Sequence, residues 1–206
     1  MIFKFIIIIL LFLLANISFS KEIPILVISP SKTFQSKGVV GSDVSVIPES
    51  SIDNSSNFFV NDIISNNISG THLSRQGGVG TNTLFQVRGL PKRYTNVYID
   101  GVKMSDPSTP DNSFYFNNLT NNGIRQIEVL KGNQSSLYGS GAIGGTINIY
   151  TKTSESKDLS RNINLFNGEN NTKNLLISFD QQKERFDYFL GLNRYLTDGI
   201  SAMTHN

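Results

Sequence analysis

The chain has 206 residues, which is enough for one ordinary domain and part of a second. It contains no cysteine, so disulfide frameworks, thiol catalysis and thiolate metal sites are excluded. The formal net charge is only +2, and the charges are spread along the chain without a basic block of the kind that binds nucleic acid.

The N-terminus has the pattern of a secretory signal peptide, which we place at residues 1–20. Lys4 supplies a short positive region, residues 5–14 form an unbroken apolar run, and Ser18 and Ser20 precede a cleavage point. A membrane anchor is the alternative, but the apolar run is short for a full span. No later stretch is apolar enough for a membrane helix, so a mature protein that resides in a membrane would have to be a β-barrel.

Residues 21–38 are predicted to be extended. The stretch IPILVISPS holds apolar residues between Pro24 and Pro30, and each proline disfavours helix at the residue before it. This pattern favours a loose strand flanked by flexible chain.

Residues 39–152 are predicted to form a small α/β domain with long loops. Short β-rich runs recur in VGSDVSVIP, LFQVRG, TNVYIDG, IRQIEVLKG and TINIYT. One helix is predicted in SSNFFVNDIISNN, with Ser55 or Ser56 as its cap. Asp100 and Gly101 are predicted to make a turn, because Asp bonds its own backbone and Gly permits a positive φ. The loops SRQGGVGTN, LPKRYT and MSDPSTPDNSFYF are long for a compact domain, which is typical of functional loops.

Residues 153–206 begin with a polar linker and continue with alternating runs. RNINLFNG, NLLISF and ERFDYFLGLNRYL predict three antiparallel strands. The third run places Phe186, Tyr188, Leu190 and Leu192 on one face and Asp187, Gly191 and Asn193 on the other, with Phe189 as an exception. Such alternation is typical of an outer-membrane barrel wall, and equally of a soluble sheet with one buried face. Three strands cannot close a barrel, so as barrel strands they would be an incomplete set.

The stretch GSGAIGG, residues 139–145, fits the G-x-G-x-x-G pattern of a dinucleotide-binding loop. That loop needs a helix immediately after it, because the helix N-terminus holds the pyrophosphate. Here the β-branched, alternating run TINIYTK follows, so dinucleotide binding is disfavoured. We expect Gly139, Gly141, Gly144 and Gly145 to permit tight turns and close backbone approach at the start of a strand.

Four blocks, LFQVRG, VYIDGV, IRQIEVLKG and SSLYGSGAIGGTINIYT, occur in this order and at close spacing. Together they resemble the plug domain of TonB-dependent outer-membrane receptors, and most closely the cobalamin receptor branch, over about residues 39–151. Lys131 and Asn133 depart from the arginine and proline that the family often has there. The resemblance implies an α+β plug domain, a small mixed sheet with short helices and long loops, at residues 39–152. It also implies that residues 153–206 are the first antiparallel strands of a transmembrane β-barrel.

The resemblance further implies roles for particular residues. The residues implied to form a TonB box, which adds as a strand to the sheet edge of TonB, are Ile25, Leu26, Val27, Ile28 and Ser29. Without the resemblance, a disordered N-terminus with a few apolar residues would give the same pattern. The residues implied to contact a ligand from outward-facing loops are Arg75, Gln76, Gly77, Gly78, Gly80, Arg93, Tyr94, Tyr115 and Phe116.

The residues implied to hold the plug in the barrel, or to be structural, are Arg88, Gly89, Asp100, Gly101, Arg125, Glu128 and the four glycines of GSGAIGG. The charged residues of this set are expected to pair with residues of the barrel. Ordinary ion pairs within the plug are the alternative, since Glu128 lies in a strand beside Arg125. His72, the only histidine away from the C-terminus, is predicted to be a loop residue, and no protein metal site or cofactor is expected.

The function implied by the resemblance is energy-coupled uptake of a scarce large nutrient across the outer membrane of a Gram-negative-type bacterium. A corrinoid is the first candidate ligand, and an iron-siderophore or haem is the alternative. The implied partners are TonB, outer-membrane lipid and the transported ligand, with the plug in the barrel lumen and the N-terminus facing the periplasm. A secreted, barrel-less binding module is a second hypothesis. An enzyme is disfavoured, because no nucleophile–base or paired carboxylate arrangement is found.

Overall fold

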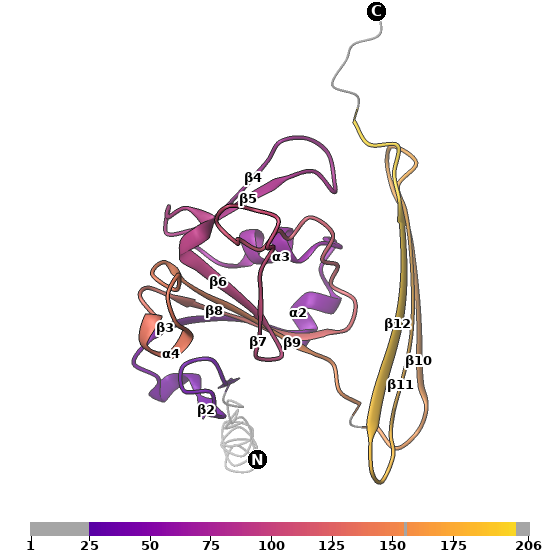
Figure 1. Ribbon diagram of the computed structural model, residues 1–206. Helices are drawn as coiled ribbons and strands as arrows, with labels where there is room; N and C mark the ends of the chain where they lie inside the picture. The colour runs from indigo at the N-terminus through magenta and orange to yellow at the C-terminus, as the bar shows by residue number, and fades with distance from the viewer. Residues whose placement is uncertain (1–24, 155, 201–206) are drawn as a thin grey trace, which may run out of the picture.

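The computed structural model describes residues 25–154 and 156–200. The predicted signal peptide and the first residues of the predicted extended segment lie outside this part. The described chain forms a plug and, beside it, a separate antiparallel sheet (Figure 1).

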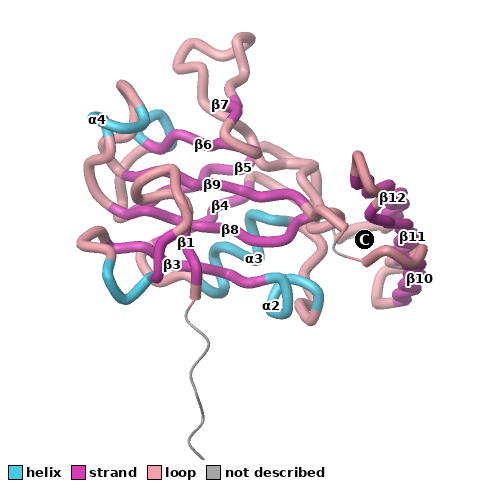
Figure 2. The backbone as a smooth tube through the Cα atoms, turned by 90° about the horizontal axis from the view of Figure 1, so that it is seen from below, coloured by secondary structure: helices cyan, strands magenta, loops and turns pink. Residues whose placement is uncertain are grey.

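The plug is built on a five-stranded mixed sheet. Its strands lie in the order β3 (Asp43–Pro48), β8 (Ile124–Lys131), β9 (Gly145–Thr151), β6 (Thr95–Ile99) and β7 (Val102–Met104) (Figure 2). Neighbouring strands are antiparallel except β6 and β9, which run parallel. Four of the predicted strand blocks therefore meet in this sheet, and the predicted mixed-sheet plug is confirmed.

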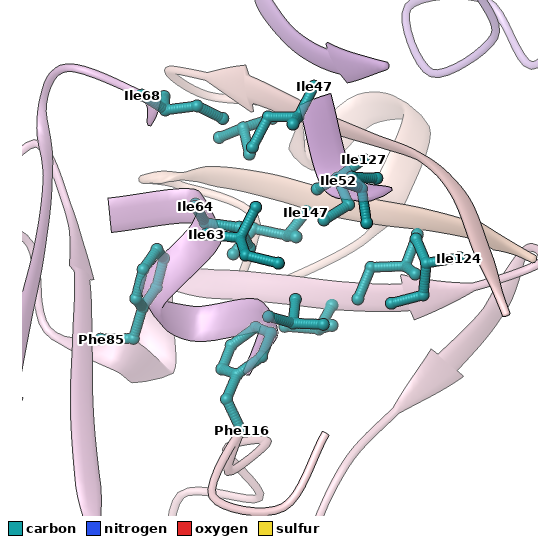
Figure 3. Packing of buried hydrophobic residues seen from close by; sticks show 14 of the residues in the cluster. Ile47, Ile52, Ile63, Ile64, Ile68, Phe85, Phe116, Ile124, Ile127 and Ile147 are labelled. Carbon is teal, nitrogen blue, oxygen red and sulfur yellow. The ribbon is translucent and has the colours of Figure 1, made fainter. Parts of the chain in front are cut away.

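Two helices cover one face of this sheet, α2 (Glu49–Asp53) and α3 (Val60–Asn67). The main core lies between them and the sheet, and Figure 3 shows Ile47, Ile52, Ile63, Ile64, Ile127 and Ile147 packed there. The predicted cap is wrong, because α3 begins after Phe59 without any side-chain cap. Ser55 instead accepts a hydrogen bond from the N–H of Asn57, in the turn before the helix.

The opposite face of the sheet carries the N-terminal segment and a short helix. The segment holds β1 (Leu26–Val27), β2 (Gln35–Ser36) and the 3-10 turn η1 (Lys37–Val39), and the helix is α4 (Ser135–Tyr138). A second buried cluster lies on this face and consists of Val27, Val44, Tyr98, Leu130, Tyr138 and Ala142. The sheet is thus buried on both faces by chain from distant parts of the sequence.

The LFQVRG block lies in β5 (Thr83–Val87), which pairs with β4 (Thr71–Arg75) in a separate hairpin that rises from the plug (Figure 1). His72 lies in β4 opposite Gln86, so its prediction as a loop residue is wrong. The 3-10 turn η2 (Lys92–Tyr94) then leads into β6.

Asp100 and Gly101 form the turn between β6 and β7, with φ of 46° and 81°. The reason predicted for Asp100, a bond from its side chain to its own backbone, is wrong. Its carboxylate instead accepts hydrogen bonds from the N–H of Thr151 at 2.9 Å and from the Thr151 hydroxyl at 2.6 Å. The turn is therefore tied to the end of β9.

The second sheet contains β10 (Ser160–Asn167), β11 (Lys173–Gln182) and β12 (Asp187–Leu196), paired antiparallel in that order. One face carries large exposed apolar side chains: Ile163, Leu165, Phe179, Tyr188, Leu190, Leu192 and Leu196. The other face is turned toward the plug (Figure 2). Phe189, which broke the alternation, lies on the plug side, where a Cβ added at Gly123 would fall 2.8 Å from its ring.

No helix in the part of the chain that the structure describes has the length and apolar character needed to cross a membrane.

Candidate functional site

The N-terminal segment at residues 25–29 lies docked on the plug. Leu26 and Val27 pair with Ser36 and Gln35, and the N–H of Lys37 donates to the carbonyl of Ile25 at 2.8 Å. Val27 is fully buried. The sequence predicted a loose strand flanked by flexible chain, and this is corrected: the strand is extended, but its backbone is hydrogen-bonded within the plug.

Glu128 holds the next two residues of the segment. Its carboxylate accepts the N–H of Ile28 at 2.9 Å and that of Ser29 at 2.8 Å, and the Gln126 amide donates to it at 2.6 Å. Glu128 is fully buried, so these donors replace the water that the charge would otherwise need. Hydrogen bonds to an ionised acceptor are about twice as strong as neutral ones.

Arg125 does not pair with Glu128, so the alternative of an ion pair between them within the plug is not found. The expected role of Glu128 at the barrel wall is corrected, because its carboxylate is buried against the N-terminal segment. A register shift in β8 separates Ile124 from Gln126, and Arg125 lines the space between the plug and the second sheet, together with Asp180 and Phe189. The Nε of Arg125 is buried and has no hydrogen-bond partner among the described residues. Its proposed role at the barrel wall stays a prediction.

Two tyrosines complete the contacts to Ser29. The hydroxyl of Tyr138 donates to the Ser29 carbonyl at 2.7 Å, and the Tyr150 hydroxyl lies 3.2 Å from the Ser29 hydroxyl. Burial raises the pKa of both phenols, so both hydroxyls keep their protons at neutral pH. Sequence reasoning did not find Tyr138, Tyr150 or Gln126, because nothing in a local pattern shows which distant segment a side chain will meet.

The GSGAIGG stretch connects α4 to β9. Gly145 has a φ of +148°, and a Cβ there would fall 2.2 Å from the carbonyl oxygen of Leu130. A Cβ on Gly144 would fall 3.1 Å from the carbonyl oxygen of Tyr94. Gly139 and Gly141 have φ of +77° and +93°. These are the turns and close backbone approaches for which glycine was expected.

Two of the predicted ligand loops border one cavity of about 390 Å³. Its lining residues are Lys92, Arg93, Thr95, Asn96, Lys103, Met104, Ser105, Asp111, Asn112, Ser113, Phe114, Ser140 and Gly141. Lys92 ties the two loops together, because its ammonium lies 3.6 Å from the ring centre of Tyr115 and 3.9 Å from a carboxylate oxygen of Asp111. The guanidinium of Arg93 stacks on Tyr94 at 4.8 Å.

The third predicted ligand loop is the tip of the β4–β5 hairpin. Gln76, Gly77, Gly78 and Gly80 are exposed there. Arg75, in contrast, pairs with Asp62 of α3, so its guanidinium faces the plug body.

Phe116 is placed differently from the prediction. It is only 3% exposed, and its ring packs 5.4 Å from Phe85 and 5.0 Å from Phe114. The prediction that Phe116 offers a flat apolar surface to a ligand is therefore wrong. Burial of the apolar ring in the core is more favourable than its exposure on a loop.

Arg88 forms an ion pair within the plug. Its guanidinium lies 2.7 Å from Asp43, which Lys131 also approaches at 3.7 Å. Both partners are about half exposed, and such pairs contribute about 0–1 kcal/mol. Gly89 follows with a φ of +73° at the turn after β5. A role of Arg88 at the barrel wall stays a prediction.

Aromatic rings make part of the contact between the plug and the second sheet. The ring of Phe58 lies 4.9 Å from that of Phe166, and the ring of Phe59 lies 5.2 Å from that of Tyr195, both edge to face. A Cβ added at Gly191 would fall 2.7 Å from the Asn122 amide. In the sequence, the signal for this contact was the pair of neighbouring phenylalanines, Phe58 and Phe59. Both were assigned to the predicted helix, so the contact was not predicted.

Among residues 25–154 and 156–200, no three His, Asp or Glu side chains gather in a way that could hold a metal ion. Of the predicted ligand residues, Arg93 lines the cavity, whereas Tyr94 lies against the guanidinium of Arg93 and Tyr115 lies against the ammonium of Lys92. The N-terminal segment lies on the α4 face of the sheet.

Comparisons with known proteins agree with this architecture. The sequence model of the TonB-dependent Receptor Plug Domain family matches residues 37–146. The vitamin B12 transporter BtuB of Photobacterium profundum is 40% identical over 75 residues, covering 36% of this chain and 12% of that protein. BtuB of Vibrio vulnificus strain YJ016 is 30% identical over 125 residues, covering 61% of this chain and 20% of that protein. This chain thus spans a fifth or less of the length of these relatives.

Solved structures give the same fold at lower identity. The outer-membrane ferripyoverdine receptor of Pseudomonas aeruginosa superimposes with a TM-score of 0.64 at 16% identity, covering 79% of this chain and 21% of that one. The ferric yersiniabactin uptake receptor FyuA of Yersinia pestis gives 0.55 at 17% identity, covering 69% and 22%. At such identities the likeness concerns the fold alone.

Proposed function

Because the chain belongs to the TonB-dependent receptor plug domain family, we propose that it is the N-terminal part of an outer-membrane receptor for energy-coupled import of a scarce large nutrient. In this proposal residues 39–152 are the plug that closes a barrel lumen, and residues 153–206 begin the barrel wall. The observation that carries the proposal is the combination, in one chain, of the plug sheet, a docked N-terminal strand and an adjoining three-stranded antiparallel sheet.

Outer-membrane lipid is the proposed surrounding of the second sheet. Its outward face carries side chains such as Leu165, Leu190 and Leu192, which are 79%, 64% and 58% exposed. Its plug-facing side carries polar or small residues such as Asn162, Ser178 and Gly191, which share one register row. A lipid-facing band opposite a polar lumen requires this alternation.

TonB is the proposed partner of residues 25–29. An extended strand can add to the edge of a partner's sheet, and several main-chain hydrogen bonds then share a pulling force. In the docked state the backbone of Leu26 and Val27 is paired to β2, and Ile28 and Ser29 donate to Glu128. Strand addition to TonB would therefore require the segment to leave these partners.

A corrinoid is the ligand that we propose first. The support is the identity of 30–40% to proteins described as vitamin B12 transporters. An iron chelate is the alternative, because the structural neighbours include receptors for ferric siderophores, although at identities that support only the fold. The cavity beside Arg93 and Lys92 is the part of the plug where we expect a ligand to make contact.

The experiment that tests the proposal measures uptake and binding separately. The full-length receptor is expressed in cells that lack their own cobalamin receptor, and labelled cobalamin is followed into cells and onto isolated outer membranes. We expect binding, and uptake that depends on TonB. Binding of a ferric siderophore but not of cobalamin would select the iron alternative, and binding of neither would contradict both ligands.

Val27→Pro tests the coupling segment in the same assay. Proline removes an N–H from the strand, so energised uptake should be lost while ligand binding remains. Val27→Ala is the matched control, because it removes packing but keeps the N–H. Full uptake by Val27→Pro would show that residues 25–29 are not the segment through which TonB acts.

A further inference from the structure

A hollow of about 390 Å³ lies on the outward face of the second sheet, near the turn between β10 and β11. Its surface is mostly apolar and includes Leu165, Leu175 and Leu196, but Lys173 and Arg194 also line it. The strand register places these side chains on one face. Leu165 and Arg194 lie opposite Leu175 on its two sides, and Leu196 lies opposite Lys173. The hollow thus combines an apolar floor with two cations.

The two cations are close enough to act together. Lys173 lies opposite Leu196, two residues beyond Arg194, so Lys173 and Arg194 are diagonal neighbours on exposed positions. Diagonal neighbours lie about 7–8 Å apart, a separation that long side chains can span. Glu169 and Asp198 lie at the same end of the sheet, yet among residues 25–154 and 156–200 neither cation forms an ion pair. Both positive charges are therefore available to a ligand.

The end of the sheet that carries the cations is held by a tight turn. Asn170 and Asn171 both have left-handed backbones, with φ of 53° and 52°. The N–H of Gly168 donates to the carbonyl of Thr172 at 2.8 Å, and the Thr172 hydroxyl lies 2.8 Å from that of Thr197. These contacts fix all three strands beside the hollow, so a ligand would meet a preformed surface.

The position of the cations along the strands points to the kind of ligand. The next row of the same face toward the middle of the sheet is wholly apolar and consists of Ile163, Ile177 and Leu192. Lys173 and Arg194 therefore stand where an apolar band ends, which is the level that lysine and arginine reach at a lipid headgroup. A free anion could use the cations but would leave the apolar floor exposed. A lipid offers both an acyl chain and a headgroup.

We propose that this hollow binds one lipid that has an anionic phosphate headgroup. An acyl chain lies along Leu165 and Leu175, and the phosphate bridges Lys173 and Arg194. The guanidinium of Arg194 can meet two phosphate oxygens at once, while the Lys173 ammonium acts as a compact charge. The site rests on the proposed function, because it requires the second sheet to face lipid. In Figure 1 this end of the sheet lies on the side of the β4–β5 hairpin, away from β2, so the lipid belongs to the outer leaflet.

The test measures lipid binding to the full-length receptor, purified in a neutral detergent, by native mass spectrometry. The probe is phosphatidylglycerol, and the comparison is phosphatidylcholine, whose phosphate is balanced by its own ammonium. Lys173→Gln and Arg194→Gln should each weaken binding of one phosphatidylglycerol about fivefold, and the double variant about 25-fold, as expected for cations near an anionic lipid surface. Equal affinity for the two lipids, or unchanged binding in both single variants, would overturn the proposal.

Matched controls separate this site from a general attraction between cations and lipid. Lys183→Gln removes an exposed cation from the β11–β12 turn, at the opposite end of the sheet, and should not change binding. An equal loss in Lys183→Gln would overturn the site.

The apolar floor has its own pair of variants. Leu165→Ala should weaken binding severalfold, because it removes apolar surface that the acyl chain covers. Leu190→Ala, on the same face but outside the hollow, should not. Excess inorganic phosphate should leave the lipid bound, and displacement by it would identify a site for a free anion instead.

The lipid titration does not depend on transport, so the two proposals can fail separately. Absence of cobalamin or siderophore uptake, with the lipid preference intact, would contradict only the proposed function. Uptake by a receptor that shows no preference for phosphatidylglycerol would contradict only the lipid site.

Discussion

Glu128→Gln tests what holds the N-terminal segment on the plug. Glutamine has nearly the same shape, but it carries no charge and offers only one acceptor oxygen. The N–H of Ile28 donates to both carboxylate oxygens, at 2.9 and 3.1 Å, and the N–H of Ser29 donates to the second of them at 2.8 Å. An NH₂ group in place of the first oxygen removes the shorter bond of Ile28, and in place of the second oxygen it removes the acceptor of Ser29. In either orientation one N–H of the segment loses its short hydrogen bond, and the remaining bond loses the charge.

The size of the effect follows from these contacts. A hydrogen bond to a charged group contributes about 1.5–3 kcal/mol, so we expect docking to weaken by about 2–3 kcal/mol. Since about 1.4 kcal/mol corresponds to a factor of ten, the undocked population should rise about 30- to 150-fold. The main core between α2, α3 and the sheet is not touched by the substitution.

Hydrogen exchange of the Ile28 and Ser29 amides is the direct assay, because these amides donate to Glu128 only while the segment is docked. Their exchange in full-length protein should accelerate by the factor given above. Glu184→Gln, in the exposed turn between β11 and β12, is the matched control and should have no effect. Unchanged exchange in Glu128→Gln would refute the reasoning, since the segment would then be held by other contacts.

Gly145→Ala should destabilise the plug by about 3 kcal/mol or more in denaturant unfolding, because its Cβ would overlap the carbonyl of Leu130 and its φ is +148°; a midpoint like that of the unsubstituted protein would contradict this. Gly123→Ala should displace the ring of Phe189 and loosen β12 from the plug, which faster hydrogen exchange in β12 would report and equal exchange would refute. Burial raises the pKa of Tyr150 above its ordinary value of 10.0, so this group favours the folded plug below that pH and loses the effect as the pH rises further. Docking should therefore stay constant through neutral pH and weaken above about pH 10. Maleimide labelling of the single thiol in Val27→Cys, at a position that is fully buried when the segment is docked, would show this, and a loss of docking near neutral pH would contradict it.

The strands could be predicted from the sequence because apolar alternation is a local property. The short helix α2 and strands β4 and β7 were missed, since each has too few apolar residues to show a period. Phe189 could not be explained from its own strand, because its ring fills the space that Gly123 leaves open on the plug. Alternation thus indicates which face is apolar, but an exception is explained only by the surface opposite.

The role of Glu128 could not be predicted for a similar reason. By the resemblance, Glu128 was expected to pair with the barrel wall, and an ion pair within the plug, with Arg125 nearby in the sequence, was the alternative. The donors that allow Glu128 to be buried are backbone N–H groups about 100 residues earlier in the chain. Backbone donors exist at nearly every residue, so no sequence pattern distinguishes those of Ile28 and Ser29 from any others.

The strand order of the plug also has a consequence for how the chain must fold. The strand β9, made last of the five, lies in the centre of the sheet between β8 and β6. β3 has no neighbour until β8 is complete, and β6 gains its parallel partner about 50 residues after its own synthesis. Long-range pairing of this kind slows folding and leaves strand edges exposed in the meantime. A chain that emerges from its N-terminus therefore carries an unpaired β3 until residue 131 has arrived, and one open edge of β6 until residue 151 has arrived, so during this interval these strands depend on other molecules for protection.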